Sequence, residues 1–224
     1  MTRREINRCI RLFVKGGDSD LGRHRLGRYA SFDYCFNFFR GYYTAGQTTE
    51  MASGENIEAS CLHLGFYLAS WGMLRPSSHL LQRSAKYYET VIRKIAEADV
   101  RLWSIDANAY GEENIRLLLG FSEQLRTAFD FAITDTLVTK IMLGAFGNVP
   151  AFDQRFCTGM KMYTFGRQSL HRLAEFYDEH HAVIDRYHQR LHTLDFATGR
   201  NTHLLYTRAK IIDMIGFIKG GESA

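Results

Sequence analysis

Hydrophobic residues recur at the three- and four-residue spacing of helices along most of this chain. Strict alternation of apolar and polar residues, which is typical of strands, is never sustained. Only two prolines, Pro76 and Pro150, are present, so long helices are permitted almost everywhere. The pattern predicts helices over residues 2–15, 27–45, 55–73, 77–98, 112–131, 134–147, 166–181, 182–193 and 203–218.

The chain is long and apolar enough to bury a full core. It has 224 residues, of which 46% are hydrophobic, and it contains no apolar run of the roughly 18 residues that a membrane span needs. The charged N-terminus, with no apolar segment after it, predicts no signal peptide. Four scattered cysteines without a Cys-x-x-Cys pair predict free thiols in a cytoplasmic protein. We therefore expect one compact all-α domain.

Positive charge is concentrated at the N-terminus. Residues 1–28 hold eight Lys or Arg against three acids, a net +5, so the rest of the chain carries −1 of the total +4. The sequence thus divides into a basic segment, residues 1–28, and a helical domain, residues 29–224. A basic patch attracts polyanions, and this predicts DNA or another nucleic acid as a partner. A solvated arm is the alternative. The candidate nucleic-acid contacts are Arg3, Arg4, Arg8 and Arg11.

One lysine stands in an otherwise uncharged run that turns and delivers one aspartate. Thr134 suits the start of a helix, and Gly147 suits its end. On a helical wheel Lys140 shares a face with small residues, including Gly144 and Gly147, so we expect open space beside its amine. Asp153 follows just after the turn.

Two interpretations of Lys140 and Asp153 stay open. Burial favours the uncharged form of an amine, and an uncharged amine is a nucleophile that forms Schiff bases. Asp153 would then act as a base. Alternatively the two residues form an ion pair that fixes the turn against the helix, and the residues alone favour this. Lys210 and Asp213, three residues apart on another apolar helix, allow a similar pair or a four-charge network.

No cofactor or metal site is predicted. His188 and His192 have a spacing that allows shared metal coordination, but no HExxH pattern occurs and neighbouring arginines oppose a bound cation. We interpret these histidines as part of an exposed polar helix face. No P-loop, GxSxG or GxGxxG pattern is present either, so P-loop NTPase, triad hydrolase and dinucleotide-binding functions lack sequence support.

Three patches resemble a family of bacterial proteins whose activity is not settled. They comprise residues 66–75 (FYLASWGMLR) with the following Ser77 and Ser78, residues 134–144 (TDTLVTKIMLG) through 149–156 (VPAFDQRF), and residues 210–214 (KIIDM). The likeness spans about residues 60–218. It supports no particular reaction.

A second resemblance covers residues 139–153 only. Thr139-Lys140 followed by Val149-Pro150-x-x-Asp153 is similar to the active-site segment of helix-hairpin-helix DNA glycosylases of the 8-oxoguanine type. The resemblance implies a glycosylase-like fold, in which Lys140 attacks the sugar C1′ and Asp153 assists. The chain departs from that family because residues 129–138 contain neither Gly nor Pro, so the phosphate-binding hairpin before the lysine is missing.

A glycosylase would also need groups that hold an extruded base and its DNA. The candidates for substrate binding are Trp71, Arg75, Phe152 and Arg155, with Trp103 as a further stacking wall. The leading hypothesis is therefore DNA glycosylase-like base excision with lyase activity. The alternative is a non-catalytic nucleic-acid- or protein-binding module of a bacterial defence or toxin system.

Overall fold

The computed structural model describes residues 1–15 and 22–222. The glycine pair Gly16-Gly17, followed by Asp18-Ser19-Asp20, predicts a loop over residues 16–20, which lies outside the described residues. The described residues are 65% helical with 4% in strands, which confirms the all-α prediction. Its described residues form nine α-helices: α1 (Arg3–Lys15), α2 (Ala30–Thr44), α3 (Ile57–Ser70), α4 (Glu89–Ala96), α5 (Glu112–Arg126), α6 (Asp135–Phe146), α7 (Gln154–Met160), α8 (Arg167–His188) and α9 (Arg208–Gly221).

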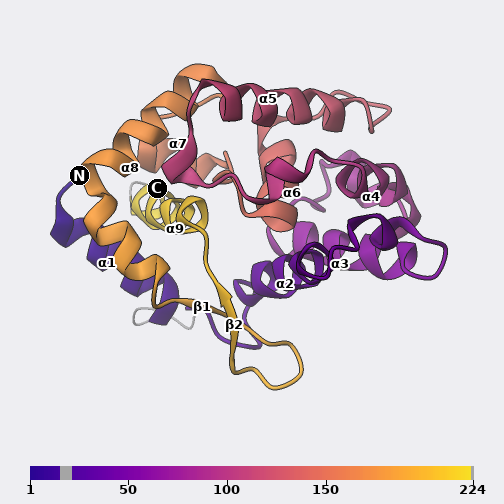
Figure 1. The fold of residues 1–224 in the computed structure, drawn as a ribbon, viewed down its shortest axis with the longest axis horizontal. Helices are drawn as coiled ribbons and strands as arrows, with labels where there is room; N and C mark the ends of the chain where they lie inside the picture. The colour runs from indigo at the N-terminus through magenta and orange to yellow at the C-terminus, as the bar shows by residue number, and fades with distance from the viewer. Residues whose placement is uncertain (16–21, 223–224) are drawn as a thin grey trace.

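Figure 1 shows α1, α8 and α9 together on one side of the molecule, with α2, α3 and α4 on the other. Helix α6 lies between these groups, and ten of its twelve residues are buried. It contacts α2, α3 and α5. Helix α1 packs against α9 through Ile6, Cys9, Ile10 and Phe13, all fully buried. The helix of the basic N-terminal segment is therefore part of the same core as the rest of the chain.

Several predicted helices have different boundaries in the structure. Residues 77–98 form two 3-10 turns, His79–Gln82 and Ala85–Tyr88, before α4 begins. The cause of this interrupted helix lies in nearby residues: the Ser78 side chain accepts a hydrogen bond from the Leu80 amide and so caps the first turn. Residues 166–181 and 182–193 were predicted as separate helices, but α8 runs unbroken to His188, because the buried stripe of Leu170, Leu173 and Ile184 continues along it.

The sequence pattern did not predict a short antiparallel hairpin, which contains β1 (His192–Leu194) and β2 (Asn201–Leu205). His192 pairs with Leu205 and Leu194 pairs with Asn201. The hairpin is attached to α2, because Asn37 donates to the Leu194 carbonyl at 2.8 Å and Asp33 accepts from the Leu194 amide at 2.9 Å. Its β2 strand occupies residues that were expected to begin the last helix, which instead starts at Arg208.

Helices α7 and α9 cross at unusually close range through glycines. A Cβ on Gly159 of α7 would lie 2.1 Å from the Gly216 carbonyl oxygen and 2.7 Å from the Gly220 amide nitrogen of α9. These separations are too short for atoms that are not bonded to each other. The two backbones can therefore touch only because neither helix carries a side chain at the crossing. The crossing brings the N-terminus of α7, where Asp153 lies, close to the core.

We expect Gly159→Ala to destabilise the protein by about 1–3 kcal/mol, because the added methyl group forces α7 and α9 apart. Gly120→Ala in α5 is the matched control, since a Cβ added at Gly120 would meet nothing within 4 Å. The control should gain up to about 1 kcal/mol from helix propensity. Urea denaturation of both variants measures the difference. A Gly159→Ala variant as stable as Gly120→Ala would show that the crossing is not tight.

Candidate functional site

The lysine and aspartate predicted from the sequence do meet. The Lys140 amine donates a hydrogen bond to Asp153 Oδ2 at 2.9 Å. The Lys140 side chain is 3% exposed and that of Asp153 is 18% exposed. Thr134 caps the start of α6, because its hydroxyl accepts from the Leu137 amide, and Gly147 caps its end in the left-handed conformation, so both predicted ends are confirmed.

The turn between α6 and α7 is bound to the face of α6. Thr139 Oγ1 accepts from the Phe152 amide and Thr136 Oγ1 donates to the Phe152 carbonyl, both at 2.8 Å. Asp153 then caps α7, because its Oδ1 accepts from the Phe156 amide at 3.0 Å. Each carboxylate oxygen of Asp153 thus has a separate partner. The sequence signal for this cap was weak, because the short helix α7 was not predicted.

A second buried pair holds the same turn from α9. The Lys210 amine donates to Asp213 Oδ2 at 2.6 Å, and Asp213 Oδ1 accepts from the Ala151 amide at 3.0 Å. The ring of Trp71 lies 5.0 Å from the Lys140 amine and 5.1 Å from the Lys210 amine. The two lysines therefore share one aromatic ring, and both aspartates bind backbone amides of residues 151–156.

The expected open space beside Lys140 is absent, and that prediction was wrong. Gly144 faces the ring of Tyr67 from α3, and a Cβ on Gly144 would lie 2.5 Å from Tyr67 Cε1. Tyr67 is itself buried, and burial raises the pKa of its hydroxyl well above its usual value. The gap that both lysines line does not admit a water molecule. A nucleobase has no room beside the Lys140 amine in this conformation.

The residues predicted to bind substrate are dispersed. Phe152 and Trp103 are buried in the core, and Trp71 is half-buried and stacks on Tyr29 with 5.2 Å between ring centroids. Arg75 and Arg155 are exposed, and the Arg155 guanidinium lies 4.9 Å from the Phe217 ring on α9. Of the predicted set, only Trp71 and the Lys140–Asp153 pair come together.

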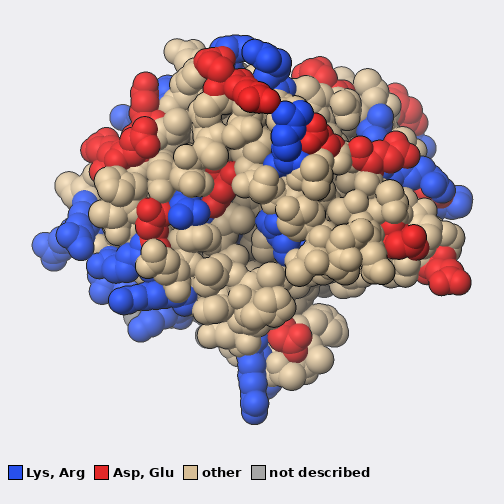
Figure 2. Space-filling model, viewed as in Figure 1, with Lys and Arg blue, Asp and Glu red and all other residues tan. Residues whose placement is uncertain are grey.

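The four arginines predicted to contact nucleic acid are all exposed on α1. Arg4, Arg8 and Arg11 are four and three residues apart, so they form one stripe, which Lys15 extends. Arg8 binds the carboxylate of Glu222, which follows α9. Figure 2 shows Lys and Arg side chains gathered over α1.

A buried carboxylate on α2 was not predicted from the sequence. Asp33 is 1% exposed and accepts from the Tyr206 hydroxyl at 2.5 Å, while the Arg23 guanidinium lies 3.8 Å away. Burial raises the pKa of Asp33 to about 6, and the nearby Arg23 opposes that rise. The one sequence signal was an aspartate within an aromatic-rich helix. The group joins α2 to the hairpin and to residues that follow α1.

Comparison of the chain with family models, curated proteins and solved structures found no match. None of the helices in residues 1–15 and 22–222 is long and apolar enough to cross a membrane. Within the same residues, no three His, Cys, Asp or Glu side chains are grouped so that they could hold a metal ion. His188 binds the Tyr206 carbonyl through Nδ1 at 2.6 Å.

We expect Asp153→Ala to cost about 3–5 kcal/mol of stability, because it leaves the Lys140 charge buried without a partner and removes the α7 cap. Lys140→Met should cost under about 1.5 kcal/mol, since Asp153 keeps its cap and some solvent exposure. The double variant Lys140→Met, Asp153→Ser should be about as stable as Lys140→Met alone, because the serine hydroxyl still caps α7. Urea denaturation tests the three variants, and equal costs for the two single substitutions would contradict this account.

Asp33 should make stability depend on pH. The folded-state pKa of Asp33, about 6, exceeds the ordinary 3.8. The stability that this shift contributes to the free energy of unfolding is therefore fully present below about pH 3.8 and is lost as the pH rises through 6. Between pH 7 and pH 5 the wild type should gain roughly 1 kcal/mol relative to Asp33→Asn. Asp195→Asn is the contrasting control: hydrogen bonds from Thr198 lower the Asp195 pKa below its ordinary 3.8, so this carboxylate stays ionised in the folded and unfolded states at both pH values, and the stability difference between wild type and Asp195→Asn should not change between pH 7 and pH 5. Denaturation at both pH values measures each difference.

Proposed function

We propose that the protein is a non-catalytic nucleic-acid-binding module and that it contacts phosphates through the outer face of α1. The observation that carries this proposal is the stripe of Arg4, Arg8, Arg11 and Lys15. Within residues 1–15 and 22–222, Arg8 is the only one of these four side chains that has a carboxylate within 4.0 Å. The stripe therefore presents three cations whose charge no described carboxylate neutralises.

The support beneath the stripe favours binding over a loose solvated arm. The opposite face of α1 is fully buried at Ile6, Cys9, Ile10 and Phe13. Asn7 is held as well, because its Oδ1 accepts from Arg186 at 2.5 Å and from the Tyr187 hydroxyl at 2.9 Å. A helix fixed in this way loses little entropy when its exposed side chains bind a partner.

The dimensions of the stripe suit a phosphate backbone. Arg4 and Lys15 are eleven residues apart in one helix, or about 16 Å. A nucleic-acid strand presents regularly spaced charges over such a length, and releasing their counterions drives binding. Contacts of this kind position a protein on the duplex without selecting a base sequence.

Base excision through Lys140 stays a prediction, and the geometry supports it less well. Such chemistry requires the Lys140–Asp153 hydrogen bond to open and the Tyr67 ring to leave Gly144. Borohydride trapping on duplexes with damaged bases addresses it directly. A covalent adduct with the wild type that Lys140→Met does not form would favour the enzyme over the binding module.

We expect the triple variant Arg4→Gln, Arg11→Gln, Lys15→Gln to lose most of its affinity for a short DNA duplex. Three phosphate contacts predict a slope of log affinity against log salt of about −2.7, or about a 40-fold loss between about 50 and 200 mM salt. Fluorescence anisotropy over a salt series measures both quantities. The slope should be close to zero in the variant.

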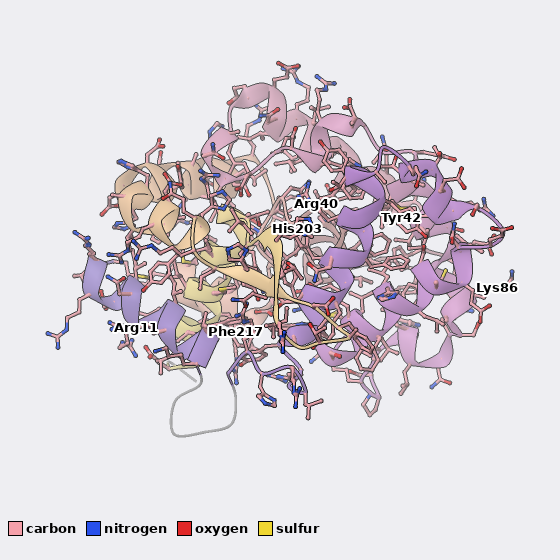
Figure 3. All side chains as sticks on the ribbon, turned by 60° about the horizontal axis from the view of Figure 1, so that its bottom comes forward. Arg11, Arg40, Tyr42, Lys86, His203 and Phe217 are labelled. Carbon is pink, nitrogen blue, oxygen red and sulfur yellow. The ribbon has the colours of Figure 1, made fainter. Side chains whose placement is uncertain are left out.

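The matched control removes three positive charges elsewhere, through Lys86→Gln, Lys94→Gln and Arg116→Gln. Figure 3 shows Lys86 and Arg11 at opposite ends of the molecule. The control should keep the affinity and the slope of the wild type to within about twofold, although its net charge equals that of the first variant. The proposal fails if the wild type does not bind duplex at low salt, or if the two triple variants bind equally.

A further inference from the structure

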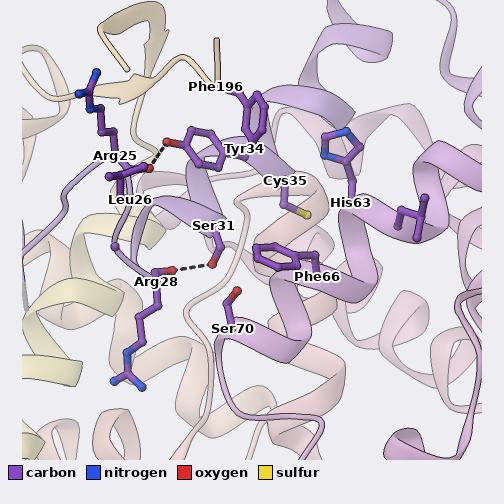
Figure 4. A pocket seen from close by; sticks show the side chains of 12 residues that line it. Arg25, Leu26, Arg28, Ser31, Tyr34, Cys35, His63, Phe66, Ser70 and Phe196 are labelled. Carbon is purple, nitrogen blue, oxygen red and sulfur yellow. Dashed lines mark hydrogen bonds between the residues drawn. The ribbon is translucent and has the colours of Figure 1, made fainter. Parts of the chain in front are cut away.

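A pocket of about 550 Å³ lies between residues 25–28 and the helices α2 and α3, with Phe196 of the hairpin loop at its edge. Figure 4 shows its lining residues. The volume falls within the roughly 300–1,000 Å³ that small-ligand sites occupy. It is separate from the buried lysine pairs and from the basic stripe of α1, so neither of them explains it.

Large apolar side chains gather at this pocket while remaining exposed. Leu26, Leu62, Phe66 and Phe196 all line it, and their exposed fractions lie between 52% and 84%. Single exposed apolar residues are common on protein surfaces, but a group around one pocket indicates a binding site. A ligand with an apolar body would remove this surface from water.

The charge of the pocket comes from arginine. No Asp or Glu lines it, whereas Arg25 and Arg28 do. His63 also lines it and stacks on Phe38 with 4.0 Å between centroids, and burial lowers the pKa of His63, so this ring is neutral at pH 7. Burial raises the pKa of the Cys35 thiol, which therefore stays protonated. The pocket thus combines apolar walls with permanent positive charge.

One end of the pocket has the groups that bind an anion. Arg28 and Ser70 lie at the lower end in Figure 4, and Arg25 and Phe196 lie at the upper end. The Arg28 guanidinium rests near the Tyr29 ring, 5.4 Å from its centroid, and no described carboxylate lies within 4.0 Å. Within the described residues, the Ser70 hydroxyl has no hydrogen-bond partner. Both donors are available to a ligand.

We propose that this pocket binds a small amphipathic anion, an acyl chain that carries one carboxylate. The carboxylate accepts hydrogen bonds from the Arg28 guanidinium and the Ser70 hydroxyl. The chain lies against Leu26 and Phe66 and extends toward Phe196. A nucleotide fits less well, because the walls offer few polar groups to a base edge or a sugar. This site is independent of the nucleic-acid contact proposed for α1.

Isothermal titration calorimetry of the full chain with octanoate tests the proposal, and 1-octanol is the uncharged probe of equal length. The wild type should bind octanoate more tightly than octanol. Arg28→Gln should weaken octanoate by about tenfold and leave octanol unchanged, because only the carboxylate contact is lost. Phe66→Ala should weaken both probes alike. Phe66 is largely exposed, so we expect this variant to fold.

Arg25→Gln is the matched control for charge, because Arg25 lies at the end away from Ser70. It should change octanoate affinity by less than about twofold. The proposal is overturned if the wild type binds octanoate no better than octanol, or if Arg25→Gln and Arg28→Gln lose equal affinity. Sedimentation with anionic phospholipid vesicles, without binding of free octanoate, would also overturn it and assign the pocket to a lipid surface.

Discussion

The rest of the structure depends on how two buried lysine charges are compensated around the turn at residues 148–153. Each charge needs a carboxylate, because an unpaired ammonium in the core is strongly unfavourable. Asp153 and Asp213 supply these carboxylates, and each also accepts a backbone amide of residues 151–156. The requirement of charge pairing therefore fixes the turn against both α6 and α9, and it fixes the start of α7.

The position of the exposed basic stripe follows from that buried arrangement. Helix α9, which carries Lys210 and Asp213, is the surface on which α1 packs. Glu222 beyond α9 binds Arg8, so α9 also orients the outer face of α1. The buried pairs thus act on the proposed phosphate contact through packing. This assigns the two lysines of the core a role that needs no chemistry at their amines.

Features that depend on neighbouring residues could be predicted from the sequence, and features that depend on distant residues could not. Thr134 and Gly147 mark the ends of α6 because capping is decided within a few residues. The closed space beside Lys140 depends on Tyr67, which approaches from α3. The hairpin is equally non-local, because its short strands rely on Asp33 and Asn37 of α2. The pocket at Arg28 also needs three separate segments.

Arg23 connects the two proposed binding surfaces. Its amide donates to the Phe13 carbonyl of α1 at 3.0 Å, and its guanidinium donates to the Tyr206 hydroxyl at 2.9 Å and to the His192 carbonyl. Arg28, the proposed anion-binding residue, follows five positions later. A ligand bound against residues 25–28 would therefore contact a segment that Arg23 anchors to α1, to the hairpin and, through Asp33, to α2. Because binding free energies are reciprocal, any effect of that ligand on the phosphate contact would be matched by an equal effect of nucleic acid on the ligand.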